Sequence, residues 1–518
     1  MTRIRPGLRD APASVDLVVV GLGVTGAGVA LDAATRGLRV LAVDAHDLAF
    51  GTSRWSSKLV HGGLRYLAQG RVGVAHESAI ERQVLMEVTA PHLTHAVPMV
   101  LPLTSAVSRT QAAVATAGLH AGDLLRRGSH TGAETLPRPR RLSATETLQL
   151  APGLRRAGLR GGLLSWDGQL EDDARLVATI ARTAAQHGAE VRTRARVLHA
   201  TGTQVTLRDE LDGTTHRVAA RAVVNATGVW AGDLVPEVRL RPSRGSHLVL
   251  REDAFRGLRA VVTAPVPGSA SRFVMVLPQP DGTVYVGLTD EPVGGPIPDV
   301  PVPAETEIGF LLDVVSAAFE RPLRRADVVG SFAGLRPLLD PSVSEGAGSD
   351  GAGATADLSR RHAVLTSATG VVSVVGGKLT TYRRMAEDAV DAAGLAADPC
   401  RTRTLPLAGA APRDALASSE APRRLVRRYG ADADLVLDSA REATGLSADE
   451  LLAPVADGPP GCLPACLAEL VFGVTHEGAH DVADLLDRRT RVGLVPADRR
   501  RAEPAARRAL AISSRPHR

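Results

Sequence analysis

Three glycines near the N-terminus have the spacing of a dinucleotide-binding turn. Gly21, Gly23 and Gly26 follow the apolar run 15–20. In such a turn the first glycine permits a tight bend, and the second leaves room for a pyrophosphate beside the backbone. The third lets a helix pack closely on a strand. The N–H groups and the dipole of that helix then attract the phosphates. By itself the motif is weak, because glycine turns are common.

The surroundings of the turn support a nucleotide site. Residues 15–20 have the pattern of a buried strand, 25–36 of a helix and 38–43 of a second strand, which together make a βαβ unit. Asp44 ends the second strand, where its carboxylate can accept hydrogen bonds from a ribose and would repel a 2′-phosphate. The pattern therefore favours FAD or NAD over NADP. Thr25, in the same turn, is expected to contact the cofactor as well.

Two later segments favour FAD over NAD. Residues 222–228 predict a strand that runs into an Ala-Thr-Gly turn, and residues 374–380 predict a strand, a glycine pair and a helix start. A helix N-terminus beneath a flavin can stabilise the negative charge that develops on the reduced ring. The residues expected to contact the cofactor here are Ala226, Thr227, Gly228, Gly377, Lys378, Leu379 and Thr380.

The segment 51–67, GTSRWSSKLVHGGLRYL, closely resembles the signature of FAD-dependent glycerol-3-phosphate dehydrogenases, the aerobic respiratory family. Other segments that resemble the family follow in order, at 172–176, 225–230, 245–247, 287–290, 333–338 and 376–383. The resemblance covers roughly residues 14–405 and is weak beyond them. It implies oxidation of sn-glycerol 3-phosphate to dihydroxyacetone phosphate, with the electrons passed to a membrane quinone.

The resemblance also implies a substrate site. Arginine suits a phosphate because its planar donors match the phosphate oxygens. Arg65, Arg336 and Arg360 lie in segments similar to those that contact substrate in the family. Arg65 and Arg336 form the firmer pair, and Tyr66 beside Arg65 can donate a hydrogen bond to the phosphate.

Oxidation of the alcohol removes a hydride from C2, which flavin N5 can accept, and a proton from the hydroxyl group. His247 lies in a segment similar to the family's lid over the ring, and a neutral histidine suits proton acceptance. We expect it to be the general base or to orient the hydroxyl group. A structural role, as a hydrogen-bonded histidine within a strand, is equally consistent with the sequence. Arg336 and Lys378 complete the expected catalytic set. Cofactor contacts are expected from Thr52, Ser53, Ser57, Lys58, His61, Gly62 and Gly63.

The predicted fold is α/β: a glutathione-reductase-type FAD-binding Rossmann domain with an inserted sheet-rich substrate domain, followed by a helical C-terminal domain. The predicted FAD-binding domain spans 1–405, in pieces of about 14–75, 160–235 and 360–400, with substrate pieces of about 76–159 and 236–345 inserted; the helical domain spans 406–518. Loops or linkers are expected at 345–357 and 408–422.

Composition limits the remaining possibilities. The 518 residues include only three cysteines, without a second Cys or His pair at metal spacing, so neither a metal site nor a disulfide framework is expected.

No signal peptide or spanning segment is predicted. We expect a cytoplasmic protein, associated peripherally with the inner face of the cell membrane. Its basic tail, 499–518, either contacts the anionic membrane surface or is a solvated, frayed end. A homodimer is an expected assembly, and a nucleic-acid partner is not.

Three alternatives stay open. A glycerol-3-phosphate oxidase would pass the electrons to oxygen, and the sequence does not distinguish it from a dehydrogenase. An FAD-dependent amine or amino-acid oxidase would share the fold and the glycine turn but would not need several arginines aimed at a dianion. A flavoprotein that acts only as a binding module would bind FAD without being reduced by glycerol 3-phosphate.

Overall fold

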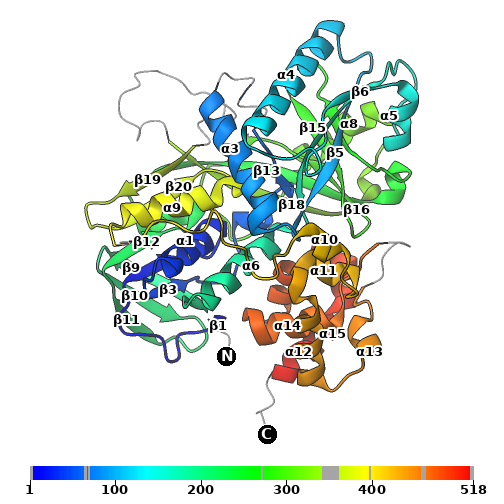
Figure 1. Ribbon diagram of the computed structural model, residues 1–518. Helices are drawn as coiled ribbons and strands as arrows, with labels where there is room; N and C mark the ends of the chain where they lie inside the picture. The colour runs from blue at the N-terminus through cyan, green and yellow to red at the C-terminus, as the bar shows by residue number, and fades with distance from the viewer. Residues whose placement is uncertain are drawn as a thin grey trace.

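Two large sheets and a helical C-terminal region make up the protein (Figure 1). The structure is a computed structural model that describes residues 4–63, 67, 71–269, 272–340, 361–395, 398–456 and 462–513.

The first sheet has seven strands, of which six are parallel and one is antiparallel. In spatial order they are β1 (Ile4–Pro6), β8 (Glu190–Thr193), β3 (Val40–Val43), β2 (Leu17–Val20), β12 (Ala222–Asn225), β20 (Val372–Gly376) and the antiparallel β19 (His362–Thr366). The strands β2, β3 and β12 are buried along their whole length and rich in valine. Parallel strands covered on both faces have this composition.

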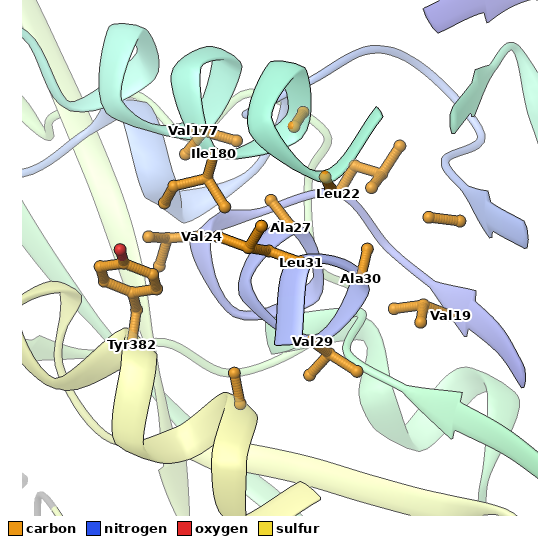
Figure 2. Packing of buried hydrophobic residues seen from close by; sticks show 14 of the residues in the cluster. Val19, Leu22, Val24, Ala27, Val29, Ala30, Leu31, Val177, Ile180 and Tyr382 are labelled. Atoms are coloured by element: carbon orange, nitrogen blue, oxygen red, sulfur yellow. The ribbon is translucent and has the colours of Figure 1, made fainter. Parts of the chain in front are cut away.

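One face of this sheet is covered by three helices: α1 (Val24–Thr35), α6 (Asp173–Gln186) and α9 (Tyr382–Ala392). Figure 2 shows Val24 and Ala27 of α1 between Ile180 of α6 and Tyr382 of α9. The opposite face is covered by the antiparallel strands β9 (Ala195–Thr201), β10 (Gln204–Asp209) and β11 (Thr215–Ala219). A doubly covered parallel sheet leaves the carboxyl ends of its strands as the place for a ligand.

The second sheet is mixed and has ten strands. They are β4 (Leu59–Val60), β5 (Thr94–Pro102), β6 (Arg140–Leu142), β7 (Gly162–Leu170), β13 (Leu240–Arg251), β14 (Val261–Pro265), β15 (Phe273–Pro278), β16 (Thr283–Gly287), β17 (Glu291–Pro292) and β18 (Val328–Leu339). The helix α8 (Glu305–Ala318) packs on β13 to β16. The helices α3 (Val72–Val84), α4 (Arg109–Gly128) and α5 (Ala144–Leu150) belong to its connections. The long antiparallel ribbon of β13 and β18 contacts β20, and so joins the two sheets.

The C-terminal region is a bundle of short helices around one core. Its elements are α10 (Arg413–Ala417), α11 (Arg423–Tyr429), α12 (Ala433–Thr444), α13 (Ala448–Leu452), α14 (Leu467–Glu477), the π-helix η10 (Asp484–Arg489) and α15 (Pro496–Ser513). Two predictions are corrected here. The expected loop 408–422 contains α10. The basic tail, as far as residue 513, is the helix α15 instead of a frayed end, because alanines at 502, 506 and 509 form one buried face.

Buried ion pairs join this bundle to the first sheet. The carboxylate of Asp47, just beyond β3, forms ion pairs with Arg488 at 2.6 Å and with Arg489 at 2.9 Å. Asp172, before α6, pairs with Arg428 of α11 at 3.0 Å. Groups so deeply buried are costly to leave unpaired, so these pairs hold the bundle in one orientation.

The predicted α/β class, with a Rossmann sheet and a helical C-terminal part, is confirmed. The predicted domain boundaries remain predictions. The strands β4 and β7 fall within the pieces 14–75 and 160–235 that were predicted for the FAD-binding domain, but they pair within the second sheet. In the part of the chain that the structure describes, no helix is long and apolar enough to cross a bilayer.

Candidate active site

The glycine turn lies between the ends of β2 and β12. Gly21 has a φ of +95°, and a Cβ atom there would come 2.7 Å from the carbonyl oxygen of Ala226. A Cβ atom on Gly26 would overlap the carbonyl oxygen of Gly21. The turn after β12, with Thr227 and Gly228 half-buried, therefore lies directly beside the first glycine. Only glycine fits both places, one for its backbone angle and one for close helix–strand packing.

The start of α1 fits a pyrophosphate. Gly23 is the N-cap, and the first turn of the helix contains no acidic side chain. The backbone N–H of Val24 donates to Ser53 Oγ at 2.9 Å, and a Cβ atom on Gly23 would approach that oxygen to 3.0 Å. Thr25 is half-buried in the same turn. The positive end of the helix, next to a small residue and a hydroxyl group, is a cradle for phosphates.

Asp44 lies at the carboxyl end of β3, beside this cradle. Its Oδ2 accepts the N–H of Leu22 at 2.8 Å, and its Oδ1 accepts the N–H of His46 at 2.8 Å. Burial raises the pKa of Asp44 to about 6, although the N–H groups of Leu22 and His46 favour the ionised form. The carboxylate keeps further lone pairs for ribose hydroxyl groups.

This pKa predicts pH-dependent binding of the cofactor. Above about pH 6 the ionised Asp44 accepts hydrogen bonds from a ribose, and below that pH the protonated form loses acceptors. We expect the affinity of the apoprotein for FAD to be constant near pH 8 and to fall by up to about tenfold per pH unit below pH 6. Fluorescence titration of FAD between pH 5 and 8 measures it. Asp44→Asn should bind FAD weakly at every pH; an Asn variant that keeps the wild-type pH dependence would contradict the assignment.

The signature segment joins the two sheets. Thr52, in the 3-10 turn 52–54, donates from Oγ1 to the carbonyl of Leu335 on β18 at 2.6 Å. Ser57 Oγ lies 2.8 Å from Nε2 of His247 on β13. Ser53, between them, faces the start of α1. Thr52, Ser53 and Ser57, three of the predicted cofactor contacts, therefore lie between the first sheet and the β13–β18 ribbon.

Lys58 is held by an acidic residue that sequence reasoning left without a role. Its side chain is 1% exposed, and Nζ contacts Asp173 Oδ1 and the carbonyl of Arg54, each at 2.7 Å. Asp173 Oδ2 also accepts the backbone N–H and the hydroxyl of Ser56. Asp173 thus shapes the signature segment from the first turn of α6. The signal was present, because Asp172 and Asp173 belong to one of the family-like segments.

The end of the signature segment packs on an ion pair. A Cβ atom on Gly62 would come 2.5 Å from Nη1 of Arg82, which pairs with Asp167 at 2.6 Å. His61 is half-buried, and Gly63 has a φ of +79°. Three predicted substrate residues, Arg65, Tyr66 and Arg360, lie outside the described residues.

Arg336 is the predicted substrate residue that the structure describes. It lies on β18 opposite Ser243 of β13. Its Nη1 contacts Asp290 Oδ1 at 3.1 Å and Ser243 Oγ at 3.3 Å, and its Nη2 donates to the carbonyl of Thr289 at 3.3 Å. A Cβ atom on Gly245 would come 2.5 Å from Nη2. These acceptors fix the plane of the guanidinium group, and Asp290 is a second residue whose role the sequence did not indicate.

His247 lies on β13, within this ribbon, as a neutral imidazole. Its ring is 1% exposed and stacks on Phe332 with 4.6 Å between the centroids. Burial, together with the positive charges of Lys58 and Arg336, lowers the pKa of His247 to about 3. While Nε2 contacts Ser57, Nδ1 has no hydrogen-bond partner among the described residues. Because so little of the ring is accessible, a role as general base remains a prediction.

The last predicted segment follows β20. Gly376 and Gly377 both have positive φ angles, and a Cβ atom on Gly377 would overlap the sulfur of Met385. Lys378 caps the 3-10 turn of Leu379, Thr380 and Thr381, and its Nζ donates to Ser78 Oγ of α3. The lysine therefore bridges the first sheet and a helix from the connections of the second.

These segments converge because of the strand order. In the first sheet β3, β2, β12 and β20 are neighbours, so their carboxyl ends bring together Asp44, the glycine turn, the 226–228 turn and the Gly376–Lys378 turn. A dinucleotide in an open parallel sheet binds at this edge. The donor set fits FAD, with a phosphate cradle at α1 and a carboxylate for the ribose. No cluster of metal-ligating side chains occurs in the described ranges.

Comparison with known proteins supports this interpretation. A family model described as FAD dependent oxidoreductase matches residues 16–383, and one described as the C-terminal domain of alpha-glycerophosphate oxidase matches residues 400–516. A protein of Mycobacterium bovis called glycerol-3-phosphate dehydrogenase 1 is 52% identical over 501 residues, which cover 95% of this chain and 94% of the relative. A mitochondrial glycerol-3-phosphate dehydrogenase of Arabidopsis thaliana is 33% identical over 93% of this chain and 80% of its own.

A solved structure has the same fold. The glycerol-3-phosphate dehydrogenase from Bacillus halodurans, complexed with FAD, superimposes with a TM-score of 0.72 and 28% identity over 98% of this chain and 92% of its own. FAD is thus the cofactor that the glycine turn and Asp44 are built to hold. The protein belongs to the FAD-dependent glycerol-3-phosphate dehydrogenase family.

Proposed function

We propose that the protein oxidises sn-glycerol 3-phosphate to dihydroxyacetone phosphate and that its physiological electron acceptor is a membrane quinone. The observation that carries the proposal is the position of Arg336. Arg336 lies on β18, the strand that packs against β20 and the signature turn at the FAD-binding edge, and its guanidinium group is oriented by Asp290 and by the carbonyl of Thr289. When bound, FAD supplies a hydride acceptor at N5 for the C2 hydrogen of the substrate.

The protein groups have separate tasks in this reaction. Arg336 binds the phosphate as a planar fork, and its fixed orientation limits where C2 can lie. Lys378 adds positive charge at the end of β20, which favours negative charge on the reduced ring. Arg65, Tyr66 and Arg360 are further proposed phosphate contacts. The β13–β18 ribbon carries Arg336 and His247, so it sets the distance between the phosphate and the group that handles the proton.

His247 is the proposed proton acceptor or orienting group. Because the pKa of His247 is lowered to about 3, the imidazole stays neutral from pH 5 to 8 and needs no deprotonation to act. We expect the dependence of kcat/KM on pH to keep its shape in His247→Gln, with a lower value throughout this range. Steady-state kinetics of both proteins test it. An ionisation near pH 6.5 that is seen in wild type and lost in the variant would contradict the neutral state.

Oxygen as the acceptor is the second candidate, because the C-terminal match is to a family model described from an oxidase. Anaerobic addition of glycerol 3-phosphate to the FAD-loaded protein should bleach the flavin absorbance, and glycine or sarcosine should not. Reoxidation by a soluble quinone analogue, with little peroxide formed in air, supports the dehydrogenase. Stoichiometric peroxide with slow quinone reoxidation supports the oxidase. A flavin that glycerol 3-phosphate does not bleach would overturn the proposed substrate.

We further propose a cytoplasmic homodimer bound peripherally to an anionic membrane through the exposed arginines of α15. Deletion of the tail is a poor test, because α15 buries its alanines in the bundle core. Arg500→Glu with Arg508→Glu changes only exposed side chains. Salt-sensitive sedimentation with anionic vesicles should decrease in this variant and persist in the control Arg217→Glu with Arg239→Glu. Equal vesicle binding by the two double variants would exclude the tail as the membrane contact. Light scattering measures whether the protein is a dimer.

A further inference from the structure

A small cavity lies between the second sheet and the C-terminal bundle, and none of the residues assigned to the active site lines it. Its volume is about 50 Å³, which is enough for a small polyatomic ion or a few water molecules. The polar side chains that line it include Arg251, Asp281, Tyr285, Arg424, Arg491 and Asp498. The first three come from the sheet and the last three from the bundle.

Three arginines line the cavity, and each of them is paired with a carboxylate. Arg251 pairs with Asp498 at 2.7 Å, and Arg491 pairs with Asp281 at 3.2 Å. The third guanidinium group, of Arg424, donates to Glu469 behind the wall and to the carbonyl of Leu463. Each of the three guanidinium groups is thus paired with one carboxylate, and because a guanidinium group has five N–H donors, these contacts leave further donors for a ligand.

Tyr285 supplies an independent observation. Its side chain is 0% exposed, and its hydroxyl group has no hydrogen-bond partner among the described residues. An unpaired buried hydroxyl group is unfavourable compared with a phenylalanine at the same place. The Arg491 guanidinium lies 5.9 Å from the centroid of the tyrosine ring. The hydroxyl group can therefore donate to a ligand in the cavity that offers an oxygen acceptor.

We propose that this cavity binds a small oxyanion, such as inorganic phosphate. The Tyr285 hydroxyl and N–H groups of the lining arginines donate to its oxygens, which gives the buried hydroxyl group a hydrogen-bond partner. The ligand joins β16 to the bundle across their interface. Arg491 also donates to the carbonyl of Glu171, directly before Asp172 and Asp173, so the oxyanion stabilises the structure that supports the signature segment.

The test uses the full-length, FAD-loaded protein and inorganic phosphate at constant ionic strength. Equilibrium dialysis should find a phosphate site whose affinity falls about tenfold in Tyr285→Phe, as expected for one hydrogen bond to an anion. Arg251→Gln, at the half-buried rim, should weaken it as well. Without phosphate, Tyr285→Phe should melt at the wild-type temperature or above it, because it loses an unpaired hydroxyl group. Added phosphate should raise the melting temperature of wild type by more than that of Tyr285→Phe.

Two comparisons separate this site from others. Phosphate bound at the substrate site should be lost in Arg336→Met, whereas phosphate bound in the cavity should persist in that variant; glycerol 3-phosphate should compete only for the former. Tyr429→Phe is the matched control, since its buried hydroxyl contacts Arg175 at 3.3 Å and lies outside the cavity. That variant should be less stable in every buffer with unchanged phosphate affinity. A cavity that holds only water gives equal phosphate binding in Tyr285→Phe and wild type, and overturns the proposal.

Discussion

Replacing Arg336 by methionine is expected to lower kcat/KM for glycerol 3-phosphate by about a thousandfold, which corresponds to about 4 kcal/mol of lost transition-state stabilisation. Two effects add up. The phosphate loses a planar, charged donor, and the carboxylate of Asp290, now 3.1 Å from an empty place, repels the dianion. Anaerobic stopped-flow reduction of the bound FAD measures the effect on the chemical step directly.

Three variants test the cause. Arg336→Lys keeps the charge but not the fork and should recover only part of the loss. Arg336→Met combined with Asp290→Asn removes the repulsion and should be more active than Arg336→Met alone. The matched control is Arg241→Met, because Arg241 lies on the same ribbon but pairs with Asp340 at the exposed surface. A control that loses as much activity as Arg336→Met would mean that the ribbon, and not the phosphate contact, was damaged.

Replacing Gly26 by alanine is expected to produce a chain that fails to retain FAD. The added methyl group would overlap the carbonyl oxygen of Gly21, so α1 must move away from β2 and the phosphate cradle opens. Displacing a helix in a tightly packed core costs roughly 1–3 kcal/mol or more. Flavin absorbance per mole of purified protein and the melting temperature measure the two effects.

Gly118→Ala provides the control, since Gly118 lies within α4 and a Cβ atom there would meet nothing within 4 Å. Alanine favours a helix over glycine by about 1 kcal/mol, so this variant should be as stable as wild type or slightly more so. Full FAD content in Gly26→Ala would show that the turn tolerates a side chain and would remove the main structural reason for the cofactor assignment.

Local patterns determined much of the nucleotide site. The valine-rich runs before Gly21 and Asp44 form β2 and β3, and the small residues between them form α1. Strand periodicity, helix caps and glycine angles act over a few residues, so the sequence alone predicts them. The later segments around Thr227 and Gly377 were predicted from their patterns of a strand followed by a glycine turn, and the strand order then showed why they meet the first turn.

Partners distant in the chain were decided only by the tertiary structure. The sequence suggested a catalytic His247, but its contact with Ser57 and its burial depend on how the β13–β18 ribbon meets the signature segment. Asp173 and Asp290 had no predicted role until Lys58 and Arg336 lay beside them.

The same holds for the C-terminal region. Its arginines suggested either a contact with an anionic surface or a solvated, frayed end, whereas α15 packs its alanines into a core, and Arg488 and Arg489 of η10 bind Asp47. The sequence by itself determined the βαβ unit, the cofactor turn and the family. The tertiary structure decided which charges are buried and paired, because burial and pairing depend on contacts between residues tens to hundreds of positions apart, which local sequence patterns do not contain.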